Sequence, residues 1–143
     1  QYTPTATSAH SAASATGNRG AASATGYQGA ASATGYQGAA SATGNRGAAS
    51  ATGNQGAASA TGYRGAASAT GDQGTASATG DQGAAMSSGY EGKAKGVDGN
   101  ALFLCERNTD MEIIAVWAGI VGKGGIEPDT YYTLSDGKPV VTA

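Results

Sequence analysis

Serine and threonine hydroxyls recur in pairs, two residues apart, through the first two-thirds of the chain. Ser23 and Thr25 form one such pair, and the pattern returns every nine residues. Residues two apart on an extended strand point to the same face, so each pair would place two hydroxyls side by side on one surface. The candidate binding face predicted in this way consists of Ser14, Thr16, Ser23, Thr25, Ser32, Thr34, Ser41, Thr43, Ser50, Thr52, Ser59, Thr61, Ser68, Thr70, Ser77 and Thr79.

Regular, rigid Thr-x-Thr arrays are the means by which several antifreeze proteins match an ice lattice, and this Ser-x-Thr array is similar. Ice binding is therefore one functional hypothesis, with an ice surface as the partner. The alternative is that Ser and Thr are simply soluble, β-compatible residues for a flat surface. Serine stands where threonine is expected, and this difference favours the alternative.

Side chains suited to catalysis are sparse. His10 is the only histidine, and its position in the repeat predicts a solvent-exposed turn residue. Cys105 lies in an apolar stretch, where cysteine usually serves as a small hydrophobic residue. With no second histidine to activate it, a nucleophilic role is not expected. Glu106, Glu112 and Glu127 are single carboxylates in a polar-surface pattern, so the sequence predicts no enzyme.

Metal and cofactor motifs are also weak. A nine-residue period invites comparison with calcium-binding β-rolls, but the turns carry aspartate only at Asp72 and Asp81. A hard cation such as calcium needs several oxygen ligands, often carboxylates. The glycine spacing matches dinucleotide-binding patterns by accident, because no βαβ unit accompanies it. No metal and no cofactor are expected.

The charge and the cysteine content exclude some partners. The formal net charge is −2, which gives no basic field for nucleic acid. No apolar run reaches membrane-spanning length, so a membrane partner is not expected either. A single cysteine allows no intramolecular disulfide and leaves the compartment open. The chain starts at Gln1 rather than Met, which leaves open a removed leader or a trimmed chain.

The element that must position the hydroxyls is a nine-residue repeat. Its clearest copies are Gly20–Gln28, Gly29–Gln37 and Gly38–Arg46, and about ten units fill the stretch from Tyr2 to Glu91. Every Leu, Ile, Val, Phe and Trp lies at or after Val97. Such a composition alone is typical of disorder, but the strict periodicity favours an ordered repeat structure.

Each unit is interpreted as a five-residue strand followed by a four-residue turn. Ala22 and Ala24 would point inward, and Ser23 and Thr25 outward. The turn Gly26–Gly29 is favoured because glycine adopts positive φ at little steric cost. Two units would close a coil of 18 residues, which predicts an all-β, two-sheet β-solenoid of about five coils.

Two other architectures compete with the solenoid. A helix is disfavoured because each interior glycine costs it about 1 kcal/mol. A trimeric fibre built from the same strands stays open, as do the handedness of the coils and the oligomeric state. The predicted solenoid would be roughly 20–25 Å long, with little apolar area buried by its alanine interior.

The composition changes after the repeats. We assign the solenoid to residues 1–96 and a small antiparallel β-meander to residues 97–143, expected to pack on the last coil and cap it. A strong hairpin signal lies at Asp136–Gly137. Strands are expected at 101–106, 112–118, 130–134 and 140–141.

The whole pattern resembles a family of phage and prophage repeat proteins of uncharacterised function. Its members carry tandem Ala-Ala-Ser-x-Thr-Gly-polar-polar nonapeptides followed by a short β-rich tail. Ala24 and Ala33 stand where other members often have Asn. The resemblance implies a phage- or host-associated setting and supplies no catalytic residue. The matching tail residues are 92–96, 102–104, 106–107, 126–134 and 136–137.

The leading functional hypothesis is a non-enzymatic structural or binding module, either a rigid spacer or a display surface. It would self-associate or bind an assembly partner through the solenoid ends or the flat faces. Ice binding is the first alternative. The second is a phage-encoded inhibitor that presents turn tyrosines to a host protein, and the compartment stays open between a virion, the host cytoplasm and the extracellular space. These tyrosines are Tyr27, Tyr36, Tyr63 and Tyr90.

Overall fold

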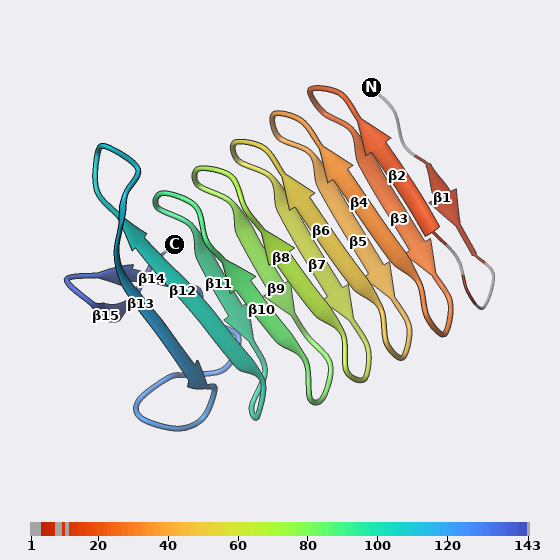
Figure 1. Ribbon diagram of the computed structural model, residues 1–143. Coiled ribbons are helices and arrows are strands. Elements are labelled where there is room, and N and C mark those ends of the chain that lie inside the picture. Colours follow the sequence, from red (N-terminus) through yellow and green to blue (C-terminus); the bar gives the residue numbers. More distant parts are fainter. Residues whose placement is uncertain (1–3, 8–9, 11, 143) are drawn as a thin grey trace.

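The computed structural model describes residues 4–7, 10 and 12–142, and the regular elements in this part of the chain are all β-strands (Figure 1). They form two sheets, which we call sheet A and sheet B. Sheet A contains, in order, β1 (Thr5–Ala6), β3 (Ala21–Thr25), β5 (Ala39–Thr43), β7 (Ala57–Thr61), β9 (Thr75–Ala78), β11 (Lys93–Gly96), β14 (Tyr132–Ser135) and β15 (Lys138–Val141). Sheet B contains, in order, β13 (Ile113–Ile120), β12 (Ala101–Arg107), β10 (Ala84–Ser87), β8 (Ala66–Ala69), β6 (Ala48–Thr52), β4 (Ala30–Thr34) and β2 (Ala12–Thr16).

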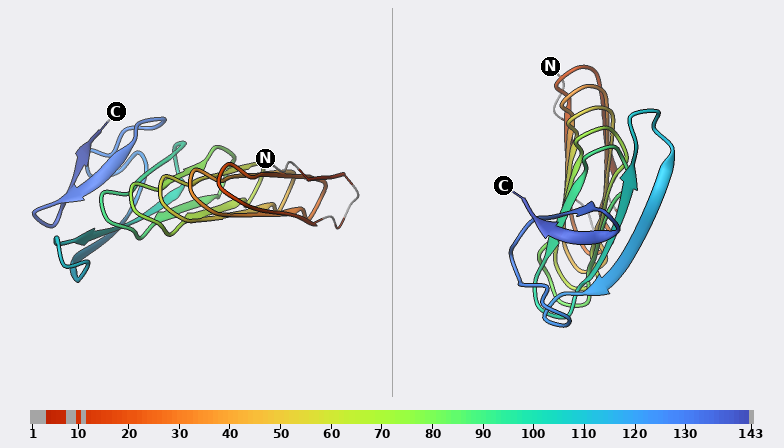
Figure 2. Two further views of the ribbon diagram at one scale, coloured as in Figure 1. Left: turned by 90° about the horizontal axis from the view of Figure 1, so that it is seen from above. Right: turned by 90° about the vertical axis from the view of Figure 1, so that its left-hand side faces the viewer.

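Successive repeat units alternate between the two sheets, and each strand pairs in parallel with the strand one coil away. The register places Ala30 beside Ala48 and Thr34 beside Thr52, an offset of 18 residues. The predicted all-β solenoid of about five turns is therefore confirmed. Figure 2 shows the result, a stack of flattened coils. The first unit is described only in part, because Tyr2, Thr3, Ser8 and Ala9 lie outside the described residues.

The space between the sheets is filled by alanine methyl groups. Ala22 is 2% exposed and Ala24 is fully buried, and the same positions are buried in each described unit from β2 to β8. The prediction that these paired alanines point inward is confirmed. The Ser and Thr positions between them face outward. Because a methyl group is the largest side chain in this interior, the two sheets must lie close together.

The two glycines of each turn serve different purposes. Gly53 has a φ of 128°, and a Cβ atom there would lie inside the carbonyl group of Gly35 in the preceding coil. The second glycine of this turn, Gly56, is buried, and a Cβ atom there would stand 3.2 Å from the Ala51 methyl. The left-handed residue between them is Gln55, with a φ of 59°. The first glycine thus supplies close coil stacking and, in the turns up to Gly62, positive φ, whereas the second supplies space.

The C-terminal strands continue both sheets. Strand β12 stacks in parallel on β10, and β13 pairs with β12 in antiparallel orientation. On the other sheet, β14 pairs with β11 and β15 with β14, both antiparallel. The antiparallel strands expected here are present, but as two hairpins, one on each sheet, rather than as one meander. The expected boundary between residues 96 and 97 falls inside this continuous stack.

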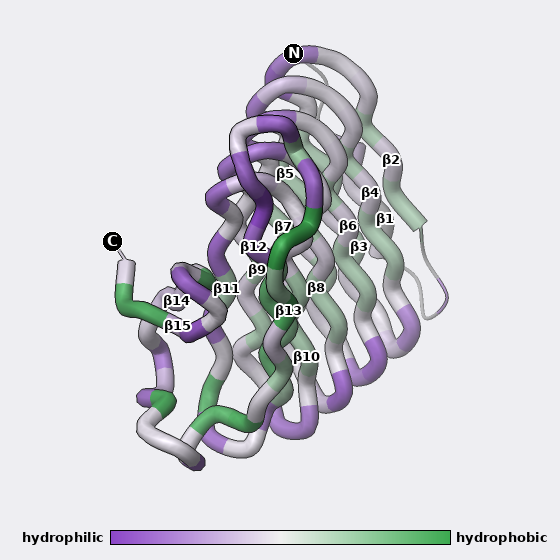
Figure 3. Tube along the Cα trace, turned by 60° about the vertical axis from the view of Figure 1, so that its left-hand side comes forward, coloured by the Kyte–Doolittle hydropathy of each residue, from purple (hydrophilic) through white to green (hydrophobic). Residues whose placement is uncertain are grey.

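Larger side chains form the core at this end. Leu102 and Leu104 of β12 lie between the sheets with Val121, Tyr132 and Leu134. Figure 3 shows strongly hydrophobic residues concentrated in β13 and its neighbours, whereas the solenoid strands are pale and the turns hydrophilic. The methyl-filled interior therefore gives way to a conventional hydrophobic core beyond β11.

Buried polar side chains join the last coil to this core. The Asn100 side chain is fully buried; its Oδ1 accepts a hydrogen bond from Gly83 N (3.0 Å), and its Nδ2 donates to Ala78 O (3.0 Å). Ser87 stands at an inward alanine position and donates to Gly74 O (3.3 Å). All the buried side-chain polar atoms among the described residues have a partner, so these groups can be buried without an unpaired donor or acceptor.

Candidate functional site: the two outer faces

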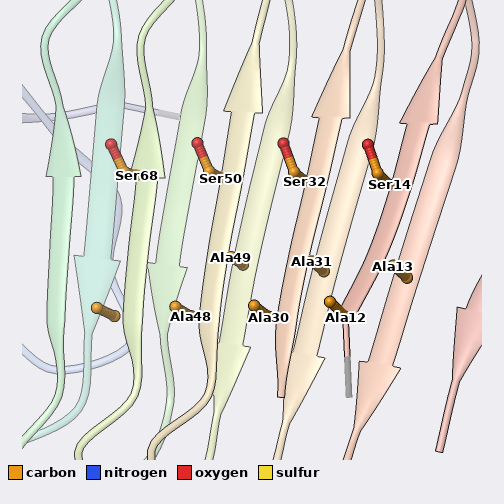
Figure 4. Close-up of a pocket in the computed structure, with 11 residues that line it drawn as sticks. Ala12, Ala13, Ser14, Ala30, Ala31, Ser32, Ala48, Ala49, Ser50 and Ser68 are labelled. Carbon is orange, nitrogen blue, oxygen red and sulfur yellow. The ribbon is translucent and has the colours of Figure 1, made fainter. Parts of the chain in front are cut away.

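The outer face of sheet B carries a regular array of small side chains. The parallel register aligns the serines of β2, β4, β6 and β8 in one row and the first alanine of each strand in another. Figure 4 shows Ser14, Ser32, Ser50 and Ser68 in line, with Ala12, Ala30 and Ala48 in a parallel line. Because these side chains are short, the face is hollowed into a shallow, mainly apolar groove that runs across the coils.

A row of threonines runs beside these serines. Thr16, Thr34 and Thr52 are exposed and sit in register at the ends of their strands. Thr70 continues the row one residue beyond β8, where its N–H still bonds Ala51 O (3.1 Å). Within the described residues, none of these four hydroxyls bonds another side chain. Parallel strands repeat about every 4.8 Å, so the hydroxyls form a straight, evenly spaced line.

The outer face of sheet A carries the second half of the predicted array, but this half is less accessible. Its serines are Ser23, Ser41, Ser59 and Ser77, of which the first three are half-buried and Ser77 is buried. Its threonines are Thr25, Thr43, Thr61 and Thr79, all exposed. Thr79 and Thr61 share a hydroxyl–hydroxyl hydrogen bond of 3.2 Å. Sheet A therefore offers fewer open hydroxyls than sheet B.

Two lysines end the array on sheet A. Lys95 lies in register with Ser77, and Lys93 with Thr75. Both ammonium groups lie over the Tyr131 ring, 4.9 Å (Lys93) and 4.8 Å (Lys95) from its centre. Lys95 also forms a salt bridge of 3.0 Å with Asp129. These contacts fasten the segment before β14 to the outer face of sheet A.

The contacts of the Lys95 ammonium displace its pKa. Its hydrogen bond to Asp129 raises the pKa of Lys95 above the ordinary value. Partial burial opposes this increase, and the charges of Tyr131 and Asp129 add to it. Because the ammonium is bound in a structural contact, the shift reports attachment of this segment and not a proton-transfer site.

The turns form two polar edges along the solenoid. On one edge, Gln37, Gln55, Gln73 and Glu91 make a ladder of side-chain hydrogen bonds of 2.9, 3.1 and 3.1 Å, each joining residues 18 apart. On the other, Arg64 bonds Gln82 at 3.2 Å. These ladders fix the coil spacing along both edges.

The turn tyrosines are divided between these edges. Tyr36 and Tyr90 follow strands of sheet B and lie on one edge, where they line a shallow groove with Asn54 and Asp72. Tyr27 and Tyr63 follow strands of sheet A and lie on the other. There, Arg46 covers Tyr27 (5.8 Å) and Arg64 covers Tyr63 (4.9 Å). The four tyrosines therefore do not form one surface.

The candidate catalytic residues are scattered. His10 lies in a turn and is exposed, as predicted. Cys105 is half-buried on the outer side of β12, beside Val116 and not between the sheets. No group of three or more His, Cys, Asp or Glu side chains in the described part of the chain is arranged to hold a metal ion.

The three single carboxylates have separate surroundings. Glu106 accepts hydrogen bonds from the backbone N–H groups of Asp136 (3.0 Å) and Gly137 (2.8 Å), and so holds the β14–β15 turn. Glu112 accepts a bond from Asn108 Nδ2 (3.1 Å). Glu127 is exposed. The structure does not bring these carboxylates together as an acid–base pair.

Comparisons with protein-family models, curated proteins and solved structures find no match.

One surface was not anticipated from the sequence. Met86 and Phe103 are each 41% exposed on the outer face of sheet B, and Val116 of β13 is 69% exposed. They extend the small-residue array into an apolar patch. The sequence signal for this patch is the uncharged stretch 113–120, in which both the odd-numbered and the even-numbered residues are apolar. Both faces of this strand therefore carry apolar side chains, and a strand with one buried face leaves the other exposed.

The described residues include no helix of the length and hydrophobicity needed to cross a membrane.

Proposed function

We propose that this protein is a non-enzymatic β-solenoid module that acts as a rigid spacer and display surface in a phage- or prophage-associated setting. The observation that carries the proposal is the unbroken outer face of sheet B between β2 and β8. It is regular, with a shallow groove across the coils, and its rows of Ala, Ser and Thr are uncharged. Such a surface suits contact with an extended partner better than it suits chemistry on a small substrate.

The internal contacts support the rigid part of this role. Every coil is joined to the next by parallel backbone ladders on both sheets. Side-chain ladders add to this along the turn edges. A stack of this kind extends by one strand spacing, about 4.8 Å, for each coil. The setting itself is proposed from the resemblance of the repeat and tail residues.

Distance measurements by double electron–electron resonance test the rod. Spin labels at Thr16 and Lys123, in a Cys105→Ala background diluted with unlabelled protein so that only distances within one chain are measured, should give one narrow distance distribution. Deletion of residues 39–56 removes one whole coil and should shift this distribution to shorter distance, by up to about 4.8 Å, without broadening it. A broad distribution in the full-length protein, or no shift on deletion, rejects the rigid spacer.

Ice binding is the second candidate, favoured by the exposed threonine line of sheet B. Thr16, Thr34, Thr52 and Thr70 are in register and make no bond to another side chain in the described structure. Serine in the neighbouring row offers a hydroxyl without the methyl group of threonine. A surface that orders water needs regular spacing, and the register of the threonines on sheet B provides it.

Thermal hysteresis and ice shaping in cold solution test this candidate. Replacing Thr34 and Thr52 by Tyr should abolish the effect by interrupting the regular threonine row of sheet B. The matched control replaces Thr43 and Thr61 by Tyr, which alters the face of sheet A by the same volume and should leave the effect in place. If the unmodified protein does not change freezing, ice binding is rejected, while the spacer proposal stands on its own measurement.

A further inference from the structure

Strand β13 forms an unprotected edge of sheet B. It is the first strand in the sheet order and pairs with β12 alone among the described strands. Its eight residues, Ile113–Ile120, include no charged residue and no proline. By contrast, β15 at the edge of sheet A contains Lys138 and Pro139. Natural edge strands usually carry such residues because an open edge recruits other strands.

The backbone groups along this edge are presented outward. Val121 N–H donates to Asn100 O (2.8 Å) at the start of the β12–β13 pairing. In an antiparallel ladder, alternate residues bond the neighbouring strand, and the residues between them point away. Counted from Val121, this alternation directs the N–H and C=O groups of Val116, Ala118 and Ile120 to the free edge, and it ends at the register shift opposite Glu106 and Arg107. They form a template for one more strand.

The side chains beside these groups are apolar and exposed. Ile114 is 57% exposed, Val116 69% and Ile120 44%. The register pairs Cys105 with Val116 and Ala101 with Ile120, so these side chains lie on the outer face of sheet B. An added strand would therefore gain both backbone hydrogen bonds and apolar cross-strand contacts.

We propose that a second copy of this chain pairs with β13 in antiparallel orientation about a two-fold axis, so that sheet B continues from one protomer into the other. The strand complements itself. Pairing even-numbered residues with even-numbered ones places Val116 opposite Ala118 of the second copy, and Ala118 opposite Val116. Both copies then use the same patch, which closes the assembly at two protomers.

The charges at the two ends of β13 favour this orientation. Glu112 precedes the strand and Lys123 follows it, and both are exposed. Antiparallel pairing brings the Glu112 end of each copy to the Lys123 end of the other, whereas parallel pairing would bring like charges together. These exposed pairs contribute orientation and specificity more than affinity.

The proposal is tested by sedimentation equilibrium of the full chain over a wide range of concentrations. The unmodified protein should be a dimer that dissociates on dilution. Val116→Lys places a charge at the edge. Ala118→Pro removes the Ala118 N–H, which points to the free edge and not to β12. Each should raise the dissociation constant at least about tenfold. Thr52→Lys, an equally exposed charge on the same face but far from β13, should leave it unchanged.

Charge reversal tests the orientation. Glu112→Lys and Lys123→Glu should each weaken the dimer, and the double variant should recover most of the loss, because each copy then presents the opposite pairing. Failure of the double variant to recover the loss overturns the antiparallel arrangement. Circular dichroism of each variant verifies the fold, and Val116→Lys keeps the test decisive if Ala118→Pro does not fold.

Other modes of association give different results. A monomer at every concentration overturns the proposal. Face-to-face stacking of sheet B would be broken by Phe103→Lys and would survive Ala118→Pro. It would also let the two Cys105 residues form a disulfide on oxidation, whereas edge pairing holds them three strand spacings apart, about 14 Å. Open-ended oligomers would overturn two-fold closure. None of these outcomes depends on the spacer or ice-binding roles.

Discussion

The repeat coils and the C-terminal strands bury side chains of very different size between the same two sheets. From β2 to β8 the interior consists of alanine methyl groups, such as those of Ala33 and Ala42. Beyond β11 it consists of Leu102, Leu104 and their larger neighbours. The backbone continues without a break, because β12 stacks in parallel on β10, with partners 17 residues apart instead of the 18 of the coils before it.

This difference shows two ways of stabilising one sheet. Burial of a leucine contributes about 1.5–3 kcal/mol, and a methyl group contributes much less. The coils therefore depend on repeated backbone hydrogen bonds and close approach, which tolerate no added volume. The C-terminal strands depend on side-chain volume, which tolerates no loss. Substitutions that add side-chain volume should therefore destabilise the coils, and substitutions that remove it should destabilise the C-terminal strands.

The largest effect is expected at the turn glycines of the coils. Gly53→Ala places a Cβ atom inside the carbonyl of Gly35, and it should lower the free energy of unfolding by about 4 kcal/mol or more. Gly17 is the matched control, since its φ is similar at 137° and no atom lies within 4 Å of the added Cβ. Gly17→Ala should cost only about 1–3 kcal/mol. Urea titrations of both variants measure the difference, and equal losses would contradict the stacking explanation.

The two interiors should respond oppositely to volume. Ala42→Leu forces the sheets apart in the coils and should cost about 3 kcal/mol. Leu102→Ala leaves a cavity in the C-terminal core and should also cost about 3 kcal/mol. Ala39→Leu, on the exposed face of the strand that contains Ala42, should change stability by less than about 0.5 kcal/mol. Thermal unfolding of the three variants compares them, and tolerance of leucine at position 42 would show that the coils are not closely packed.

The junction between the regions should be sensitive to Asn100. Asn100→Ala leaves the Gly83 N–H and the Ala78 carbonyl buried without partners, at a cost of about 1–3 kcal/mol. Hydrogen exchange should become faster at Gly83 and in the last coil. Asn54→Ala, at an exposed turn of the solenoid, is the control and should leave exchange unchanged. Identical exchange in both variants would mean that Asn100 does not join the regions.

The smallest effect is expected at the salt bridge between Lys95 and Asp129. Asp129→Asn keeps the left-handed backbone of this position and should cost less than about 1 kcal/mol near neutral pH. The pKa of Lys95 is raised in the folded protein, so the stabilisation is complete below its ordinary value of 10.5. It is lost as pH rises through the higher folded value. Above that pH, Asp129→Asn and the unmodified protein should have the same free energy of unfolding. The control Asp110→Asn should show no such pH-dependent difference.

The solenoid could be predicted because each unit repeats the same local constraints. The alternation of Ala22 and Ala24 with Ser23 and Thr25 determines which side is buried, and the glycine pairs determine where the chain turns. The division of the C-terminal strands between the sheets could not be predicted in this way, because no period indicates their partners. The turn before β12 also lacks the repeated glycine pair: its closing bond joins Asn100 N to Val97 O (3.0 Å), so Val97 and Asn100 stand where the repeats have glycine.

The hydroxyl positions of the candidate site follow from the same period, but the inequality of its two halves does not. At Ser77, the buried serine of sheet A, the neighbours are Lys93 and Lys95, whose contacts with Tyr131 join residues far apart in the sequence. The open edge at β13 could not be predicted from the sequence either. A strand rich in Ile and Val is typical of a buried position, and only the sheet order shows that it lies at the rim.

The alternation of repeat units between sheets A and B has a consequence for length variation in such chains. One nine-residue unit is half a coil, so inserting one unit transfers every strand upstream of it, relative to the C-terminal hairpins, from one sheet to the other. Odd changes in unit number would rotate the two ends of the rod by half a turn, while even changes would only lengthen it. Whether the number of repeat units is odd or even would therefore determine which threonine rows lie on the same sheet as β13.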